Sequence, residues 1–270
     1  MKLEEIYKPI AAELQRVESD LTRGVDDIDA SFIGVVLGRF FQIPGKRLRP
    51  ALTLLAAGAV DGKMPDRELL EKIGVAMELI HSASLVHDDI IDGALFRRGQ
   101  KTLNRTYGIK IAALAGDSLF TRAFSILCRY FPAEYTRIML QVTEKMCAAE
   151  IEQAKGDLSR EKYLEVIQGK TASFTSACCQ LGAKLCGAGE SVIQNLAGYG
   201  LNFGMAYQII DDFTDNDLNV AGAIRLEEAL EYAVAARNHL AELPDSVYRN
   251  SLLRLVDFLA LPAIRGGAAV

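Results

Sequence analysis

Residues 74–92 of the chain read GVAMELIHSASLVHDDIID, an apolar stretch that ends in acidic side chains. Its apolar residues recur at spacings of three and four, which is typical of a buried helix. Asp88, Asp89 and Asp92 stand at the end of that helix. Like charges one helical turn apart repel each other, so the presence of three carboxylates at this helix end needs a chemical explanation.

The same helical spacing recurs along most of the chain, and the alternation typical of strands is nearly absent. Glycine and proline fall mainly between the periodic segments. We therefore expect a single all-α domain, a bundle of about ten helices. The expected helices span residues 2–22, 28–42, 48–60, 66–92, 105–130, 134–155, 160–186, 190–216, 222–242 and 246–259.

Composition narrows the possible functions. The chain has 270 residues, of which 50% are hydrophobic, and a net charge of −5, so no basic surplus indicates a nucleic-acid partner. No apolar run reaches the ~18 residues of a membrane span, and the N-terminus lacks the layout of a signal peptide. The five cysteines form no CxxC pair, which favours reduced, mostly buried thiols in a cytoplasmic protein without stable membrane insertion.

A second acidic cluster repeats the first. Residues 204–217 read GMAYQIIDDFTDND, with Asp211, Asp212 and Asp215 in the same spacing as the first three aspartates. A divalent cation between the carboxylates would remove their repulsion, and Mg²⁺ prefers such hard oxygen ligands together with water and phosphate. No His or Cys stands at zinc spacing. An exposed acidic helix end explains one cluster readily, but two of the same pattern less well.

Three cationic groups accompany the clusters. They are PGKRLRP with Lys46, Arg47 and Arg49, FRRGQKT with Arg97 and Arg98, and QGKT with Lys170 and Thr171. Guanidinium and ammonium groups bind phosphate oxygens, although a Lys-Arg run is more often a solvated face. His81 lies seven residues before Asp88 on the same helix face. There is no GxSxG elbow or Walker-type loop.

Together these motifs resemble the trans-isoprenyl diphosphate synthases, also called polyprenyl synthetases. The resemblance runs from GKRLRP through ELIHSASLVHDDIID, RRGQKT, GDSLF and QGKTASF to GMAYQIIDDFTD, over about residues 20–216. It implies a helical bundle around a deep central cavity and a homodimeric, Mg²⁺-dependent enzyme, with three ions when substrate is bound. Such enzymes condense isopentenyl diphosphate with an allylic diphosphate.

The resemblance also implies roles for single residues. Metal ligands would come from Asp88, Asp89, Asp92, Asp211, Asp212 and Asp215, with Asp89 and Asp212 mainly shaping the field. The allylic diphosphate would contact Arg97, Lys170, Thr171 and Gln208. The isopentenyl diphosphate would contact Lys46, Arg49, His81 and Arg98. Asp88, Asp92, Arg97, Lys170 and Asp211 would carry catalysis.

Product length depends, in this family, on bulky residues four and five positions before the first aspartate motif. Here these positions hold Ser84 and Ala83, both small, so a growing chain could pass them. Ile80 and Met77 are the next candidate floors, because a helix rises ~1.5 Å per residue. We expect a product longer than C15, about C30–C40, as in the side chain of a quinone. Close packing alone would also explain the small residues.

The sequence departs from the family after residue 216. About 50 residues that normally follow the second motif are absent near 216–220, which indicates either a mobile segment left out or a short, partner-dependent protein. Two other functions therefore stay open. One is a non-catalytic or partner-dependent subunit of a heteromeric synthase, and the other is a class I terpene cyclase, against which the basic segments argue.

Overall fold

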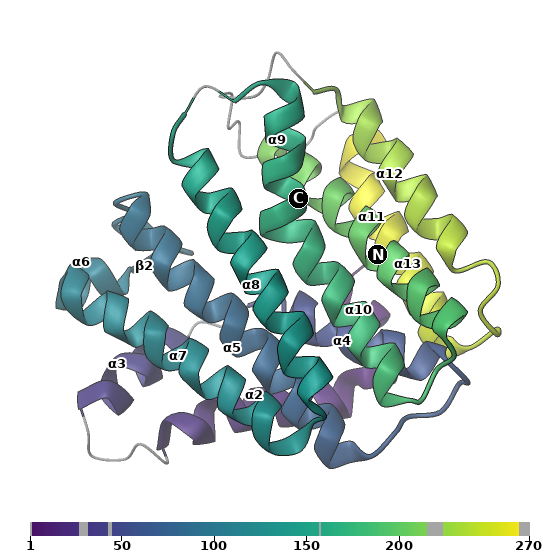
Figure 1. Ribbon diagram of the computed structural model, residues 1–270, viewed down its shortest axis with the longest axis horizontal. Coiled ribbons are helices and arrows are strands. Elements are labelled where there is room, and N and C mark those ends of the chain that lie inside the picture. The colour runs from purple at the N-terminus through teal and green to yellow at the C-terminus, as the bar shows by residue number, and fades with distance from the viewer. Residues whose placement is uncertain (1, 27–31, 43–44, 157, 215–223, 265–270) are drawn as a thin grey trace. The chain divides into compact units, whose positions relative to one another are not determined.

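The computed structural model describes residues 2–26, 32–42, 45–156, 158–214 and 224–264. In this part of the chain nearly all secondary structure is helical (Figure 1). The elements are α1 (Leu3–Ile6), η1 (Lys8–Ile10), α2 (Ala11–Asp26), α3 (Phe32–Phe41), α4 (Leu48–Ala59), α5 (Arg67–Ile91), β1 (Phe96–Arg97), β2 (Gln100–Lys101), α6 (Leu103–Tyr107), α7 (Ile109–Tyr130), α8 (Ala133–Gln153), α9 (Arg160–Ile167), η2 (Gln168–Ala172), α10 (Ser173–Leu185), α11 (Glu190–Thr214), α12 (Leu226–His239) and α13 (Val247–Ile264).

The predicted all-α class is confirmed, and the departures from the predicted helices have local causes. The first predicted helix is divided at Pro9, which lacks the backbone donor that a continuous helix needs. The predicted helix 105–130 is divided at Gly108, whose φ of +86° is left-handed. The predicted helix 160–186 contains a π-helical turn, and a two-stranded hairpin at 96–101 was not predicted. The expected gap near 216–220 lies outside the described residues.

The backbone forms two compact units, each made of several segments. Unit 1 comprises Met1–Ala11, Leu52–Pro65 and Arg137–Val270, and unit 2 comprises Ala12–Ala51 and Asp66–Thr136, so far as these are described. The first aspartate cluster belongs to unit 2 and the second to unit 1. The single domain expected from the sequence stays a prediction.

Unit 1 is built on close contact between α10 and α11, which run side by side (Figure 1). A Cβ at Gly200 would lie 2.4 Å from the carbonyl oxygen of Thr175, and one at Gly204 would lie 2.6 Å from Ala172 Cα. The Thr175 hydroxyl donates to the carbonyl of Gly200 at 2.7 Å. These glycines therefore allow the two backbones to touch, and the hydroxyl ties them together.

Buried hydrogen bonds connect α13 of unit 1 with α1 and with α11. The Ser251 hydroxyl of α13 donates to the carbonyl of Ile6 in α1 at 2.7 Å. The hydroxyl of Tyr199, a fully buried residue of α11, donates to the carbonyl of Leu252 at 2.9 Å. Both bonds satisfy polar groups that would otherwise be costly to bury.

Unit 2 is organised by α5, which packs along α7. Asp66 begins α5 by accepting hydrogen bonds from the backbone N–H groups of Glu68 (2.8 Å) and Leu69 (3.3 Å). Fully buried side chains on the two helices include Ile73, Met77, Ile80, Ala83, Ala112, Ala115, Leu119 and Ala123.

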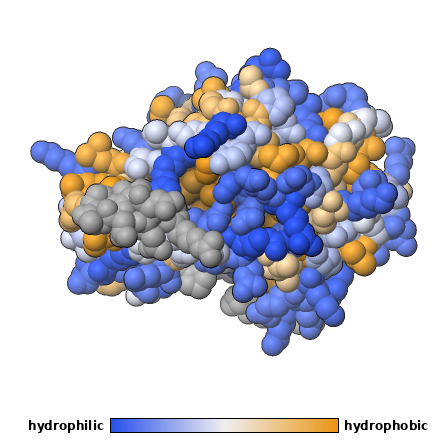
Figure 2. Space-filling model, turned by 90° about the horizontal axis from the view of Figure 1, so that it is seen from below, coloured by the Kyte–Doolittle hydropathy of each residue, from blue (hydrophilic) through white to orange (hydrophobic). Residues whose placement is uncertain are grey.

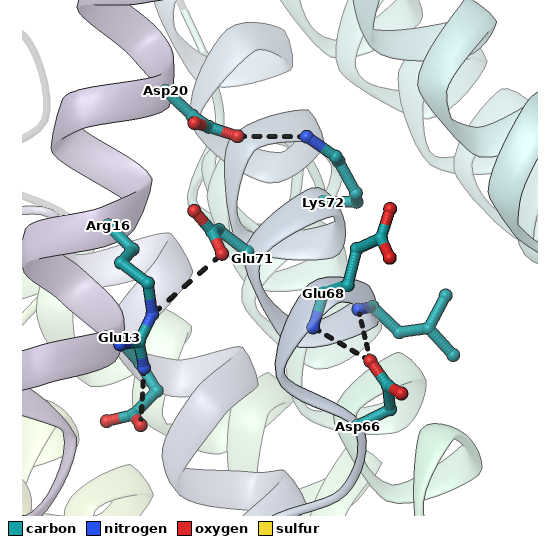
Figure 3. A network of polar contacts seen from close by, with 8 residues as sticks. Glu13, Arg16, Asp20, Asp66, Glu68, Glu71 and Lys72 are labelled. Atoms are coloured by element: carbon teal, nitrogen blue, oxygen red, sulfur yellow. Dashed lines mark hydrogen bonds and ion pairs between the residues drawn. The ribbon is translucent and has the colours of Figure 1, made fainter.

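Ion pairs connect α5 with α2 in the same unit (Figure 3). Lys72 Nζ donates to Asp20 Oδ2 at 2.9 Å, and Arg16 lies 3.0 Å from Glu13 and 3.8 Å from Glu71. These groups are partly exposed, so each pair contributes little to stability, of the order of 0–1 kcal/mol.

The surface carries scattered apolar side chains. Figure 2 shows hydrophobic atoms in patches between hydrophilic ones on the face it views. Among the described residues, one helix, α7, is long and apolar enough to cross a membrane, with 33% of its apolar window buried. One such helix is weak evidence, since core helices pass the same test. The prediction of mostly buried thiols holds for Cys178 and Cys179 and is wrong for Cys128 and Cys147, which are exposed.

The contact at Gly200 predicts a stability effect. Gly200→Ala should lower the free energy of unfolding by about 1–3 kcal/mol, because backbone atoms of α10 cannot yield to the new methyl group. Gly189→Ala is the matched control, since nothing lies within 4 Å of its Cβ position. Urea denaturation followed by circular dichroism checks this, and equal midpoints for the two variants would contradict it.

Candidate active site

The first aspartate cluster lies at the C-terminal end of α5. Asp92 caps the helix, and its N–H donates to the carbonyl of Asp88 at 2.8 Å. The two residues are therefore one turn apart, as the spacing predicts. Asp92 is exposed and Asp88 half-buried, so both carboxylates are accessible to solvent.

The middle aspartate of this cluster has a different environment. Asp89 is 4% exposed, and its Oδ1 accepts a hydrogen bond from Arg97 Nε at 2.8 Å. Burial raises the pKa of Asp89, and the charge of Arg97 opposes that rise. Asn104 Nδ2 donates to the Asp89 carbonyl at 3.0 Å. Asp89 is thus held from both its side chain and its backbone.

A tight hairpin aims the two arginines of the RRG motif. Phe96 pairs with Lys101 and Arg97 with Gln100, so Arg98 and Gly99 form a two-residue turn. Their φ values of +50° and +78° are both left-handed, as a type I′ hairpin requires. The glycine was the sequence signal for this turn. The hairpin leaves Arg98 exposed and directs Arg97 to Asp89.

The GKRLR segment meets α5 at His81. Arg49 Nη1 lies 3.2 Å from His81 Nε2. Arginine can only donate, so Nε2 accepts and the imidazole is neutral. Burial holds the pKa of His81 well below its ordinary value, and the charges of nearby arginines, Arg49 first, add to the effect.

Arg98 also belongs to this cationic group. A Cβ at Gly45 would lie 2.9 Å from Arg98 Nη1, so the arginine passes directly over the glycine. Lys46 beside it is exposed. Unit 2 therefore brings Arg98 to the GKRLR segment, as expected for one anion site.

The second aspartate cluster lies at the end of α11 in unit 1. Thr171 Oγ1 donates to Gln208 Oε1 at 2.7 Å, and Gln208 Nε2 donates to Asp212 Oδ1 at 2.8 Å. The hydroxyl of Tyr163 donates to the other oxygen, Asp212 Oδ2, at 2.6 Å. Both oxygens of Asp212 are thus held by protein groups, which parallels the position of Asp89. Half-buried Asp211 precedes it.

The π-helical turn η2 supplies Lys170 and Thr171. Single π turns inside helices are frequent at functional sites. Lys170 Nζ lies 2.5 Å from Glu150 Oε2 and 3.3 Å from Gln153 Oε1, both on α8. Gly169 permits this approach, since a Cβ there would lie 2.9 Å from Ala149 Cβ.

Two of these hydrogen-bond and ion-pair partners were not predicted from the sequence. Tyr163 and Glu150 stand outside the quoted motifs, and no local spacing connects them with the residues they hold. Thr171 and Gln208 were both predicted, and the structure brings them together. Asp215 lies outside the described residues.

The predicted chain-length residues follow one another along α5. Ala83, Ile80 and Met77 are fully buried. Ser84 is half-buried and its hydroxyl donates to the carbonyl of His81 at 2.8 Å. Their role in product length stays a prediction.

The available oxygens fit magnesium. Among the described residues, no three His, Cys, Asp or Glu side chains form a ready-made metal site. Asp88 and Asp92 at one helix end and Asp211 at the other nevertheless offer one or two carboxylates each. Mg²⁺ commonly takes that number and completes its shell with water and substrate phosphates.

A helical fold with two aspartate-bearing helix ends, each in a unit with cationic side chains, is that of the isoprenoid synthases. The family model described as "Polyprenyl synthetase" matches residues 32–220. A decaprenyl diphosphate synthase structure from Rhodobacter capsulatus superposes with a TM-score of 0.88 at 26% identity, covering 97% of this chain and 99% of that one. The chain belongs to the polyprenyl synthetase family, the trans-isoprenyl diphosphate synthases.

Curated relatives give the same result. "Heptaprenyl diphosphate synthase component 2" of Geobacillus stearothermophilus is 37% identical over 219 residues, covering 80% of this chain and 67% of the relative. "Decaprenyl-diphosphate synthase" of Dictyostelium discoideum is 31% identical over 227 residues, covering 78% of this chain and 49% of the relative. The chain thus spans two thirds or less of the length of most of these relatives.

The neutral His81 predicts a pH effect on stability. The unfolded chain binds a proton at this residue below its ordinary pKa of about 6.5, whereas the folded chain does not, so acid favours unfolding. The stability of wild type relative to His81→Gln should fall progressively as the pH drops below 6.5, with a slope of at most about 1.4 kcal/mol per pH unit. Urea denaturation from pH 5 to 8 measures this. The difference should be constant at pH 7.5–8, and parallel curves at all pH values would refute it.

Proposed function

We propose that the chain is a Mg²⁺-dependent prenyltransferase that condenses isopentenyl diphosphate with an allylic diphosphate. The supporting observation is that each aspartate cluster occurs in one unit with cationic side chains, in a family whose curated relatives are named as prenyl diphosphate synthases. Relatives named heptaprenyl, decaprenyl and solanesyl synthases support a product longer than C15, and of these only the heptaprenyl chain falls within the expected range of about C30–C40.

In this proposal some of the aspartates bind metal and the others have a structural role. Asp88, Asp92 and Asp211, with Asp215, would hold magnesium, which would stabilise negative charge on the departing diphosphate. Asp89 and Asp212 keep their internal hydrogen bonds and fix the helix ends.

Cationic and neutral polar side chains bind the two diphosphates. Lys46, Arg49, His81 and Arg98 bind isopentenyl diphosphate, with neutral His81 orienting the guanidinium of Arg49. Arg97, Lys170, Thr171 and Gln208 bind the allylic diphosphate. Because Lys170 is held by Glu150 and Gln153, its ammonium exchanges these partners for phosphate oxygens.

The reaction then needs no protein nucleophile. The allylic C–O bond breaks, and the isopentenyl double bond attacks the allylic carbon to form the new C–C bond. The released diphosphate removes the proton that restores a double bond. Buried apolar residues such as Ile80 and Met77 keep water from the cation.

Turnover of radiolabelled isopentenyl diphosphate with farnesyl diphosphate, with and without Mg²⁺, tests the function. Asp88→Asn and Asp211→Asn should each lower kcat by about 10²–10³-fold or more, because each removes a carboxylate that would hold the magnesium needed to stabilise the departing diphosphate. Asp245→Asn is the control, since that side chain is 83% exposed and lies on a loop. Full activity of either site variant would refute the assigned roles.

Product length has a separate test. Ser84→Phe should shorten the longest product to about C15–C20, because its ring adds bulk where a growing chain would pass. Ser84 is half-buried, so the ring can be accommodated. Ser84→Ala removes the same hydrogen bond without adding bulk and should leave the product unchanged. Chromatography of the dephosphorylated products decides, and identical products for both variants would count against a passage here.

A partner-dependent enzyme is the second candidate. It is favoured by two relatives, from Geobacillus stearothermophilus and Bacillus subtilis, that are named component 2 of heptaprenyl diphosphate synthase. Activity of the purified chain, eluting as a homodimer, would support self-sufficiency. A chain that extends no substrate alone but does so with a second component would support the heteromer. The terpene cyclase is not favoured by the family match.

A further inference from the structure

Three charged side chains of unit 2 have no part in the proposed reaction. Arg47 Nε and Nη2 donate to the two carboxylate oxygens of Glu18 at 2.5 and 2.8 Å. Arg47 Nη1 donates to Glu78 Oε1 at 2.5 Å. One guanidinium thus joins α2 to α5, and we call the three residues the Arg47 clamp.

The clamp is not itself an anion site. Three nitrogens of Arg47 are engaged with carboxylates, and its side chain is only 11% exposed. All three guanidinium nitrogens already donate to protein carboxylates, so Arg47 is not presented to a phosphate, unlike exposed Lys46.

Two features of the clamp lower the stability of the fold. Arg47 has a φ of +49°, a left-handed conformation that side chains other than glycine rarely adopt. Glu78 is 3% exposed on the core helix α5, and among the described residues its Oε2 has no hydrogen-bond partner. Backbone strain and a half-satisfied buried carboxylate both destabilise the fold, which indicates a role other than stability.

The clamp orients the residues around it. The carbonyl of Arg47 accepts the N–H of Ala51 at 3.0 Å and so begins α4, which carries Arg49. On α5, Glu78 stands three residues before His81, so one helix face holds Arg47 through Glu78 and meets Arg49 through His81. The strained turn thus sends Arg47 inward while Lys46 stays exposed.

We propose that Arg47 is a positioning residue, which through Glu18 and Glu78 holds Lys46 and Arg49 in place for the diphosphate of isopentenyl diphosphate. The inference rests on the proposed function. It requires a planar fork that binds two carboxylates at once, which the point charge of lysine cannot replace.

The test compares Arg47→Lys with Arg16→Met. Arg16 also joins α2 to α5, through Glu71, and pairs with Glu13 of its own helix (Figure 3). Neither partner belongs to the GKRLR segment. KM is measured for isopentenyl diphosphate and for farnesyl diphosphate separately. Arg47→Lys should raise KM for isopentenyl diphosphate at least about tenfold. KM for farnesyl diphosphate should stay within about twofold, and Arg16→Met should change neither.

A second variant separates positioning from stability. Arg47→Met combined with Glu78→Met replaces the buried pair by apolar side chains of similar length, which often preserves folding. Its melting temperature should stay close to that of wild type while KM for isopentenyl diphosphate remains raised. Glu18→Gln, which weakens the fork alone, should act in the same direction to a smaller extent.

The outcomes are distinguishable. Unchanged KM for isopentenyl diphosphate in a folded Arg47→Lys enzyme overturns the inference and leaves the proposed function intact. Equal increases in both KM values, together with a lowered melting temperature, also overturn it, because they indicate a structural role. A wild type that consumes no isopentenyl diphosphate under any condition overturns the proposed function and the inference with it.

Discussion

Repulsion between neighbouring carboxylates is the constraint on which both helix ends depend. In each cluster, one aspartate is held by hydrogen bonds from its own unit: Arg97 holds Asp89, and Tyr163 with Gln208 holds Asp212. Arg97 offsets the charge of Asp89 and so lowers the repulsion on its neighbours. The neutral donors Tyr163 and Gln208 stabilise the charged form of Asp212 without removing its charge, so the repulsion between Asp211 and Asp212 remains.

In unit 2, positive charges are also balanced by neighbouring groups. Four arginines lie close enough to His81 to influence its protonation, and a neutral imidazole avoids adding a further charge. Glu18 and Glu78 offset one of those arginines. In the proposed anion site, Arg47 is thus balanced by carboxylates while Lys46 and Arg98 stay exposed. This arrangement destabilises the fold at buried Glu78, whose second oxygen has no hydrogen-bond partner within the described part of the chain.

The sequence was sufficient for the helical class and for placing the candidate metal-binding aspartates at helix ends. Helical periodicity is a local signal, so α5 and α11 could be placed from it, together with the aspartates at their ends. The contact between Tyr163 and Asp212 could not be predicted, because the two residues are 49 positions apart and no local spacing connects them. The π turn was missed because it depends on a contact with a neighbouring element, Gly169 against α8, that overrides local preference. The hairpin has a local signal in Gly99, but a glycine between two helices is equally typical of a loop.

The π turn at Gln168–Ala172 has a consequence for how this region can change in length. A π turn holds one residue more than an α-helical turn, and each residue of an α-helix turns the chain by ~100°. Because the π turn absorbs this additional residue, loss of one residue here would restore a regular α-helical turn and leave the flanking helices nearly in their present orientation. The directions of Lys170 and Thr171, which lie within the turn, would change. The π turn is therefore a place where the chain can shorten by one residue without moving α10, at the expense of the two side chains that the turn presents.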